Sequence, residues 1–280
     1  MARAGLDTYD MSNGHRSTTN PAPLDADADA GSPPRLAIDG VRATITLARP
    51  RHRNRLHGED LATLQRHLAA VAATPGLRVL VLTGTGSAFC AGFHLDELQV
   101  GGDGPGRFAQ AVDALAALPL PSVARLNGGV YGGAVDLALA CDFRLAVDTL
   151  EARMPAARIG LHYYASGLAR AVARLGVGGA KRLFLTGQAL RAAELLQLGF
   201  VDGCVPAAEL DASVDALAAA LAAGAPLAVQ GMKRSLDELA LGRADPGTLR
   251  EREDRCAASA DLREGLAALA AGRTPRFQGR

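Results

Sequence analysis

The chain has 280 residues and a formal net charge of +1, with 49% hydrophobic and 21% charged residues. This length allows one large domain or two small ones, and the composition is that of an ordinary globular protein. There is no basic block, signal peptide or apolar run of membrane-spanning length, so we expect a cytoplasmic protein without nucleic-acid or membrane partners.

The first predicted secondary structure follows an N-terminal extension. Residues 1–34 are rich in Asp, Ala, Pro, Ser and Thr, which is typical of a disordered segment. Alternating apolar residues over 35–39 and 41–47 predict a β-hairpin. Apolar positions spaced as on a helix follow over 61–71, and the continuous apolar run 79–82 predicts a strand buried on both faces.

Strands and helices then alternate through the middle of the chain. Residues 99–106 are glycine-rich and expected to be mobile. The pattern predicts a helix over 108–118, a strand over 122–126, a helix over 133–140 and a strand over 143–147. Such alternation favours stacked ββα or βαβ units with right-handed crossovers.

The last part of the chain is predicted to be mostly helical. One short apolar segment, 200–205, interrupts it. We therefore divide the ordered chain into a core domain, 35–205, and a C-terminal helical region, 206–280. Many of these helices carry Ala and Leu on more than one face, which indicates contacts with other subunits. The predicted helices are 167–175, 178–185, 191–197, 208–222, 226–240, 247–258 and 260–271.

Two glycine-containing segments carry the chemical signal. Residues 87–95 and 127–136 each follow an apolar strand with a small-residue turn and a helical pattern. Such turns leave backbone N–H groups without partners. Two turns facing one another would bind an anion without a charged side chain. A thioester oxygen that becomes an enolate needs such a site.

These segments resemble those of a known family. Phe89-Cys90-Ala91-Gly92-Phe93 is similar to the Phe-x-Ala-Gly-x motif of the crotonase, or enoyl-CoA hydratase/isomerase, superfamily. Further similarity comes from Gly132-Gly133, Leu185-Thr186-Gly187, Gly199-Phe200-Val201 and the Glu264-Gly265 pair, and the resemblance extends from residue 35 to about 277. It implies an α/β fold, a crotonase-type spiral of repeated ββα units with a C-terminal helical region. It also implies a homo-oligomer, either a trimer or a hexamer.

The resemblance assigns two backbone donors and one carboxylate. The N–H groups of Phe93 and Gly133 fall on the oxyanion-hole positions; the alternative is a pair of strand-to-helix turns without a ligand. Asp136 falls where hydratases have their first catalytic glutamate, although an Asp in a first helical turn also stabilises the helix dipole. In hydratases of the family a second catalytic glutamate directly follows a proline. In this chain Pro155 is followed by Ala156, so the second glutamate is missing.

Two further side chains are acid/base candidates. A gap-free count places Tyr164 at a third functional position of some branches of the family. His162 is the other candidate, because imidazole is the side chain that most often serves in acid/base catalysis at neutral pH. A structural role is the alternative for each of them.

Other positions are expected to bind the substrate. Arg49-Pro50 followed by Asn54-Arg55-Leu56 resembles the stretch that binds the adenine end of coenzyme A. The cluster of basic residues there would contact phosphate, or would form a solvated loop. His94 would line the acyl pocket or support it. The expected substrate-binding set is Arg51, Arg53, Asn54, Arg55, Ala91, His94, Gly132 and Ala156.

The sequence therefore predicts an acyl-CoA enzyme that stabilises a thioester enolate. The alternatives are an enoyl- or dienoyl-CoA isomerase, other enolate chemistry such as decarboxylation or thioester hydrolysis, and a non-catalytic acyl-CoA-binding protein. Four widely spaced cysteines, without metal-ligand spacing, predict reduced thiols and no metal. No cofactor is expected, because coenzyme A enters as part of the substrate.

Overall fold

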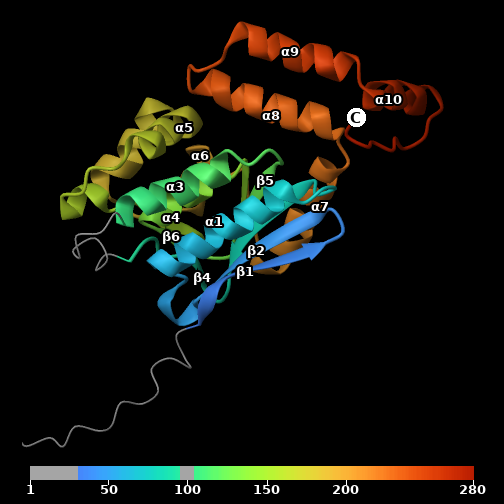
Figure 1. Cartoon of the computed structure of the whole chain (residues 1–280). Helices are drawn as coiled ribbons and strands as arrows, with labels where there is room; N and C mark the ends of the chain where they lie inside the picture. The colour runs from blue at the N-terminus through green and yellow to red at the C-terminus, as the bar shows by residue number, and fades with distance from the viewer. Residues whose placement is uncertain (1–30, 95–103) are drawn as a thin grey trace, which may run out of the picture.

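The fold contains two β-sheets covered by helices, with a helical extension at the C-terminus (Figure 1). The computed structural model describes residues 31–94 and 104–280. The predicted disorder of residues 1–30 and mobility of 99–103 lie outside the described residues. Within the described part, residues 104–106 of the glycine-rich segment form the first turn of a helix, which corrects the expectation for these positions.

The larger sheet contains the predicted hairpin and the buried strands. Its strand order is β1-β2-β3-β5-β7-β10, and every pair is parallel except β1 with β2. β1 begins at Ser32, so residues 32–34 belong to the sheet and not to the disordered extension. Two prolines are tolerated there because β1 is an edge strand. The bounds are β1 (Ser32–Asp39), β2 (Arg42–Ala48), β3 (Val79–Gly84), β5 (Ser122–Leu126), β7 (Phe143–Val147) and β10 (Gly203–Val205).

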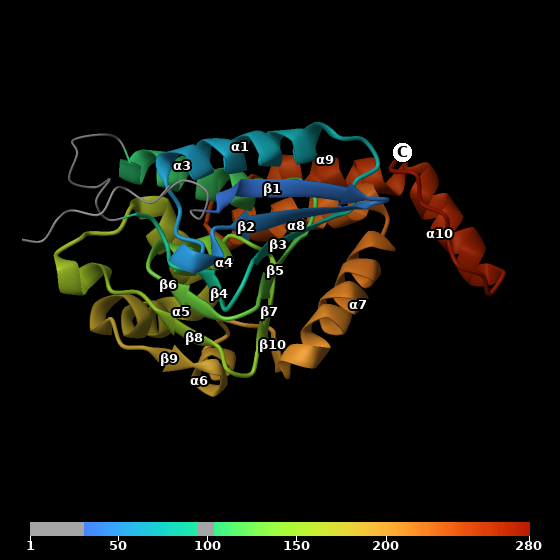
Figure 2. The same cartoon turned by 90° about the horizontal axis from the view of Figure 1, so that it is seen from below.

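This sheet separates two apolar clusters. Alternate residues of β3 point to opposite faces: Leu80 and Leu82 belong to the main core, and Val79 and Val81 to a second cluster. On the main-core side lie α1 (Gly58–Ala73) and α3 (Gly104–Ala116), and α7 (Leu210–Ala222) covers the other side (Figure 2). Both faces are buried, as the apolar run 79–82 predicted.

A second, four-stranded sheet has the order β4-β6-β8-β9. Its strands contain only two or three residues each, too few to show a hydrophobic period, and the sequence pattern did not predict them. β4, β6 and β8 are parallel, and β9 runs antiparallel to β8. The bounds are β4 (Ala88–Cys90), β6 (Gly129–Tyr131), β8 (Glu151–Arg153) and β9 (Leu190–Arg191).

The remaining core helices follow the prediction. The helices expected over 167–175 and 178–185 both form, as the two halves of α5 (Ala165–Thr186) on either side of a kink at Gly176, where φ is +66°. The other elements are α4 (Gly133–Leu139), α6 (Ala192–Gln197) and the 3-10 turns η1 (Pro50–His52), η2 (Ala156–Ile159) and η3 (Ala207–Glu209).

The C-terminal extension consists of α8 (Pro226–Ala240), α9 (Pro246–Ala257) and α10 (Ala260–Ala270). α8 and α9 form a hairpin, and α10 projects beyond it (Figure 1). α7, which the sequence grouped with this region, packs on the core sheet. Within the described residues no single helix is long and apolar enough to cross a membrane; η3–α7 and α8 together satisfy length and composition, with a bend of 105°.

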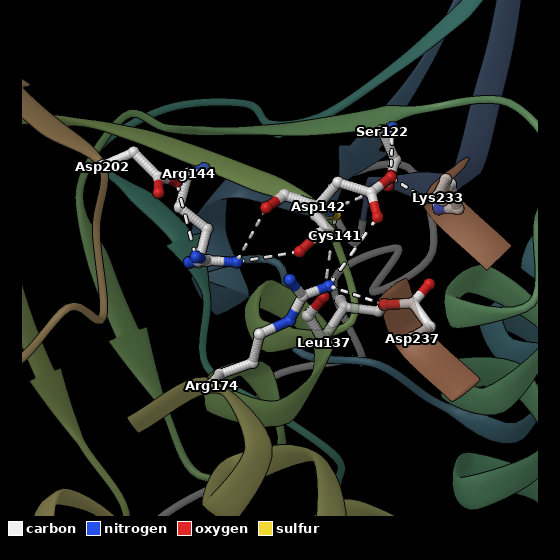
Figure 3. Close-up of polar contacts among 9 residues, drawn as sticks. All are labelled: Ser122, Leu137, Cys141, Asp142, Arg144, Arg174, Asp202, Lys233 and Asp237. Atoms are coloured by element: carbon white, nitrogen blue, oxygen red, sulfur yellow. Dashed lines mark hydrogen bonds and ion pairs between the residues drawn. The ribbon is translucent and has the colours of Figure 1, made fainter. Parts of the chain in front are cut away.

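A polar cluster joins α8 to the core (Figure 3). Lys233 of α8 places its Nζ 2.5 Å from Oδ2 of Asp142, and this oxygen also accepts hydrogen bonds from the backbone and side chain of Ser122. Arg174 of α5 lies between two carboxylates, 3.7 Å from Asp142 and 3.6 Å from Asp237. The C-terminal hairpin is therefore attached to its own core by a partly buried ion-pair network.

Candidate active site

Two chain turns face one another beside the four-stranded sheet. β4 and β6 are parallel neighbours, with Ala88 opposite Gly129, so the chain leaves both strands at the same edge. A Cβ built on Gly92 would lie 2.6 Å from the carbonyl oxygen of Tyr131 and 2.9 Å from the backbone nitrogen of Gly133. Gly92 also has a φ of +87°, which other residues rarely adopt. Glycine at this position therefore allows the two turns to approach closely.

Each turn leaves one backbone N–H outside the hydrogen-bonding ladders. Phe93 forms a parallel bridge with Leu56, in which Leu56 donates to the carbonyl of Gly92 and accepts from the N–H of His94. This pattern leaves the N–H of Phe93 on the side away from Leu56. Gly133 begins α4, so its N–H has no partner within that helix. Both groups can therefore donate to a ligand.

Asp136 lies in the first turn of α4, three residues after Gly133, and is completely buried. Its Oδ1 accepts a hydrogen bond from Nε of Arg170 at 2.8 Å. Its Oδ2 accepts a hydrogen bond from the hydroxyl of Tyr164, and the hydroxyl of Tyr163 lies 3.4 Å from the same oxygen. A buried carboxylate needs such partners, because an isolated charge in the interior is costly. Both carboxylate oxygens are therefore engaged by neighbouring side chains.

The start of α5 supplies most of this environment. Tyr164 is the N-cap residue, and Gly167 and Arg170 follow at intervals of three, which places all three on one side of the helix. A Cβ on Gly167 would lie 2.6 Å from Oδ2 of Asp136, so glycine gives the carboxylate room. Arg170 also donates to Oδ1 of Asp113 at 2.9 Å. Arg170 was not among the predicted site residues, because its contact with Asp136 comes from the packing of α5 against α4.

The electrostatics of the cluster keep its phenols protonated. Burial and the charge of Asp136 both raise the pKa of Tyr164, and the same two causes raise the pKa of Tyr163. Burial disfavours the charge on Arg170, but hydrogen bonds and attraction to Asp136 outweigh it and raise the pKa of the guanidinium. The arrangement is therefore a charged Asp136–Arg170 pair with two neutral phenols as hydrogen-bond donors.

Aromatic rings connect this cluster to the glycine turns. Phe108 is 4% exposed, and its Cζ would lie 2.6 Å from a Cβ added to Gly133. Its ring is 6.0 Å from that of Phe93 and 6.4 Å from that of Tyr164, and Tyr164 in turn stacks on Tyr163 at 4.5 Å. An apolar wall therefore runs from the first turn to the carboxylate.

Three of the predicted site residues are not among the described hydrogen-bond partners of Asp136. His162 is exposed in the segment before α5 and is not among the side chains that contact Asp136. Ala156 is buried in the main core at the start of η2. His94 stacks on His57 with ring centres 4.6 Å apart. The structure brings Tyr164, but not His162, to the carboxylate.

The basic segment after β2 lines an open pocket. Arg51 and Arg53 are exposed around η1, while Arg55 is half-buried. Arg55 lines a pocket of about 520 Å³ together with Arg49, His52, His57, Gly58, Glu59 and Arg107. Arg49 is ion-paired with Glu59 and Asp60. Positive charge therefore gathers beside the turn that carries Phe93, because Leu56 bridges to that residue.

Asn54 has a different place from the one expected. Its side chain is 1% exposed and donates to the carbonyls of Thr85, Ala88 and Phe89. The amide oxygen accepts from the N–H of Arg49. We therefore correct the assignment of Asn54 as a coenzyme A ligand, because its side chain holds the first turn from inside. Ala91 and Gly132, by contrast, lie within the two facing turns and are partly exposed.

The sequence also predicted reduced cysteines. All four cysteines are free thiols, two buried and two partly buried, as expected. Burial raises the pKa of Cys90 and of Cys141 to about 12. Within residues 31–94 and 104–280, no group of three His, Cys, Asp or Glu side chains is arranged to hold a metal ion.

Comparison with known proteins places this geometry in a family. The family model described as "Enoyl-CoA hydratase/isomerase" matches residues 39–280. The chain belongs to the enoyl-CoA hydratase/isomerase family. The family and the crotonase-type fold expected from the sequence are thereby confirmed.

Individual members of the family match over most of the chain. YngF of Bacillus subtilis, named for the same family, is 32% identical over 248 residues, which cover 85% of this chain and 94% of that protein. The 2,3-dehydroadipyl-CoA hydratase of Escherichia coli is 30% identical over 245 residues, 84% of this chain and 94% of that protein. The crystal structure of an enoyl-CoA hydratase from Bacillus anthracis has a TM-score of 0.81 at 29% identity, covering 89% and 100% of the two chains.

Proposed function

We propose that this protein catalyses proton transfer on an acyl-CoA thioester through an enolate. The N–H groups of Phe93 and Gly133 would bind the thioester oxygen, and Asp136 would accept the proton. The observation that carries the proposal is the close approach of Gly92 to the nitrogen of Gly133, with a buried carboxylate three residues further along α4. Fixed donors of this kind typically contribute about 2.7–4 kcal/mol each to an enolate-like transition state.

Proton transfer is favoured over hydration by the surroundings of Asp136. The position of the second glutamate holds Ala156, whose methyl group cannot activate water. Both oxygens of Asp136 are occupied by Tyr164 and Arg170. A single carboxylate suffices to move a proton between two carbons of an enolate, as in double-bond isomerisation. Hydration requires a second group to hold and activate the water.

The substrate and the assembly belong to the same proposal. The positive charge around Arg51, Arg53 and Arg55 suits the phosphates of coenzyme A.

We also propose a homo-oligomer, either a trimer or a hexamer, because α8 and α10 expose large apolar side chains in the single chain. These side chains are Met232, Leu236, Leu239, Leu262, Leu266 and Leu269.

Product analysis in heavy water tests the reaction class. The protein is incubated with 2-enoyl-, 3-enoyl- and dienoyl-CoA thioesters in D₂O, and the products are read by mass spectrometry. Proton transfer introduces deuterium without added water, whereas hydration also adds the mass of water. Tight binding without exchange for every thioester would identify a non-catalytic acyl-CoA-binding protein.

The oxyanion hole has its own test at Gly133. Gly133→Ala and Gly133→Pro both place a Cβ against Phe108, but only the proline removes the N–H. Proline is tolerated sterically by the backbone at the first position of a helix. We expect Gly133→Pro to exchange deuterium about 10²–10³-fold more slowly than Gly133→Ala, because one donor is lost. Equal rates in the two folded variants would remove Gly133 from the proposed hole.

A further inference from the structure

The carboxylate of Asp136 is surrounded by side chains and backbone of α5 and of the residues just before it. Arg170 occupies Oδ1, Tyr164 and Tyr163 approach Oδ2, and Gly167 of α5 packs directly against Oδ2. Asp136 itself has an exposed fraction of 0%. A thioester held between the two glycine turns would therefore meet the side chains around Asp136 before it met the carboxylate.

Of these side chains, Tyr164 is the one that is linked to the glycine turns through the ring of Phe108. Its ring is only partly buried and lies edge-on to Phe108. Phe108 in turn packs against Gly133, whose N–H is the proposed donor to the thioester oxygen. The ring of Tyr163, by contrast, is buried in the main core, where it makes an edge contact with Phe184.

We propose that Asp136 exchanges protons with the thioester through the hydroxyl of Tyr164 and does not touch the substrate itself. This inference rests on the proposed function and specifies its proton path. The substrate C–H proton moves to Oη of Tyr164 as the phenolic proton moves to Oδ2 of Asp136. The C–H electron pair becomes the enolate, with negative charge on the thioester oxygen. The reverse movement returns a proton to carbon and restores the carboxylate.

This path avoids forming a phenolate. Burial and the neighbouring carboxylate raise the pKa of Tyr164, so a deprotonated Tyr164 would be a costly intermediate. In the concerted path the phenol gives up one proton as it gains another, and its charge does not change. The charge moves from the buried Asp136 to the enolate oxygen, where the backbone donors lie.

Arg170 and Asp113 would act as positioning residues in this path. Arg170 holds Oδ1 at 2.8 Å and reaches Asp113 at 2.9 Å, and Ser166 donates to the other oxygen of Asp113 at 2.9 Å. These contacts fix the orientation of the carboxylate, so that Oδ2 is presented to Tyr164. Neither Asp113 nor Ser166 contacts Asp136 in the hydrogen-bond network.

Tyr163 offers a matched control for Tyr164. Its hydroxyl approaches the same oxygen, at 3.4 Å, but it faces the core. We expect Tyr164→Phe to slow deuterium exchange about 10²–10⁴-fold, which is the usual effect of removing an acid/base group, and Tyr163→Phe to slow it less than 10-fold. The double variant Tyr164→Phe/Asp136→Asn should be no slower than the slower single variant, because residues that act as one unit are not additive. Acyl-CoA affinity and circular dichroism verify that each variant is folded and loaded.

Isotope effects on the wild-type protein provide a second readout. With a protiated thioester in D₂O, the relay moves the phenolic deuterium together with the carbon-bound proton. Single-turnover enolisation should therefore show a solvent isotope effect as well as an effect of deuterating the substrate. If Asp136 acts directly, only the carbon-bound isotope matters in this step.

The outcomes separate this inference from the function it rests on. A wild-type protein that exchanges deuterium supports the proposed function whichever path is used. The relay is overturned if Tyr164→Phe stays within 10-fold of the wild type while Asp136→Asn loses exchange, or if the solvent isotope effect is absent. A failure of the wild type to exchange with any thioester would remove the proposed function itself, and with it the relay.

Discussion

Gly92 approaches Gly133 so closely that a Cβ on Gly92 would lie 2.9 Å from the Gly133 nitrogen. The two residues come from different strand–turn segments, and the parallel pairing of β4 with β6 brings those segments together. Side chains take no part in this contact. The first turn therefore needs a glycine for spatial reasons as well as for its positive φ.

Gly92→Ala tests this close approach. The new methyl group would meet the Tyr131 carbonyl and the Gly133 nitrogen, so we expect the two turns to separate and turnover to fall about 10²–10³-fold, the effect of losing one donor. Gly76→Ala is the control, because Gly76 has a similar φ of +85° but nothing within 4 Å of its added Cβ. Both variants should lose about 1–2 kcal/mol of stability from backbone strain. An equal loss of turnover in the two would contradict the steric explanation.

Asn54→Ala tests the internal support of the first turn. The change removes donors to three carbonyls and replaces an asparagine at a φ of +56°, where alanine is disfavoured. We expect the free energy of unfolding to fall by about 2–4 kcal/mol in chemical denaturation, because buried polar groups lose partners. Asn127→Ala is the comparison: Asn127 also donates to the carbonyl of Ala88 but is more exposed, so its loss should cost less. A larger cost at Asn127 would count against the role given to Asn54.

Hydrophobic periodicity predicted the long elements but not the short ones. The strands 122–126 and 143–147 and the helix 226–240 have the predicted bounds. Each is long enough to present a repeating apolar face. The strands of the second sheet have two or three residues, and they are specified by pairing with segments distant in the chain.

The sequence predicted the backbone donors of the candidate site better than the side-chain contacts around Asp136. Motifs around Gly92 and Gly133 are local strings that can be read without a structure. The contact between Arg170 and Asp136 arises from the packing of α5 on α4, which no local pattern encodes. The prediction that Asn54 binds coenzyme A was wrong for a related reason. A polar residue in a basic loop suggests a ligand contact, but the sequence does not show that this side chain is buried.

Lys233→Met tests the attachment of the C-terminal hairpin. Lys233 has 9% of its side chain exposed, and its removal leaves Asp142 with only Ser122 and the more distant Arg174. We expect the free energy of unfolding to fall by about 2–3 kcal/mol, somewhat less than the usual cost of breaking a buried pair. Hydrogen exchange should speed up first in α8 and α9. Arg234→Met is the control, because its exposed pair with Glu238 within α8 should contribute less than about 0.5 kcal/mol. Similar losses in the two variants would show that the Asp142 cluster does not anchor the hairpin.

Leu236→Glu tests whether the apolar face of α8 is a subunit contact. Met232, Leu236 and Leu239 follow helical spacing and are 59%, 65% and 56% exposed in the single chain, which is unusual for side chains of this size on a free surface. We expect the intact protein to sediment as a trimer or hexamer and the Leu236→Glu variant to sediment as a smaller species, because burying an unpaired carboxylate opposes association. Val41→Glu places the same charge at the turn between β1 and β2, on a side chain that is 46% exposed, and should leave the assembly unchanged. A monodisperse monomer at micromolar concentration for the intact chain would contradict the proposed oligomer. An unchanged oligomer in Leu236→Glu would move the contact away from α8, to the apolar face of α10.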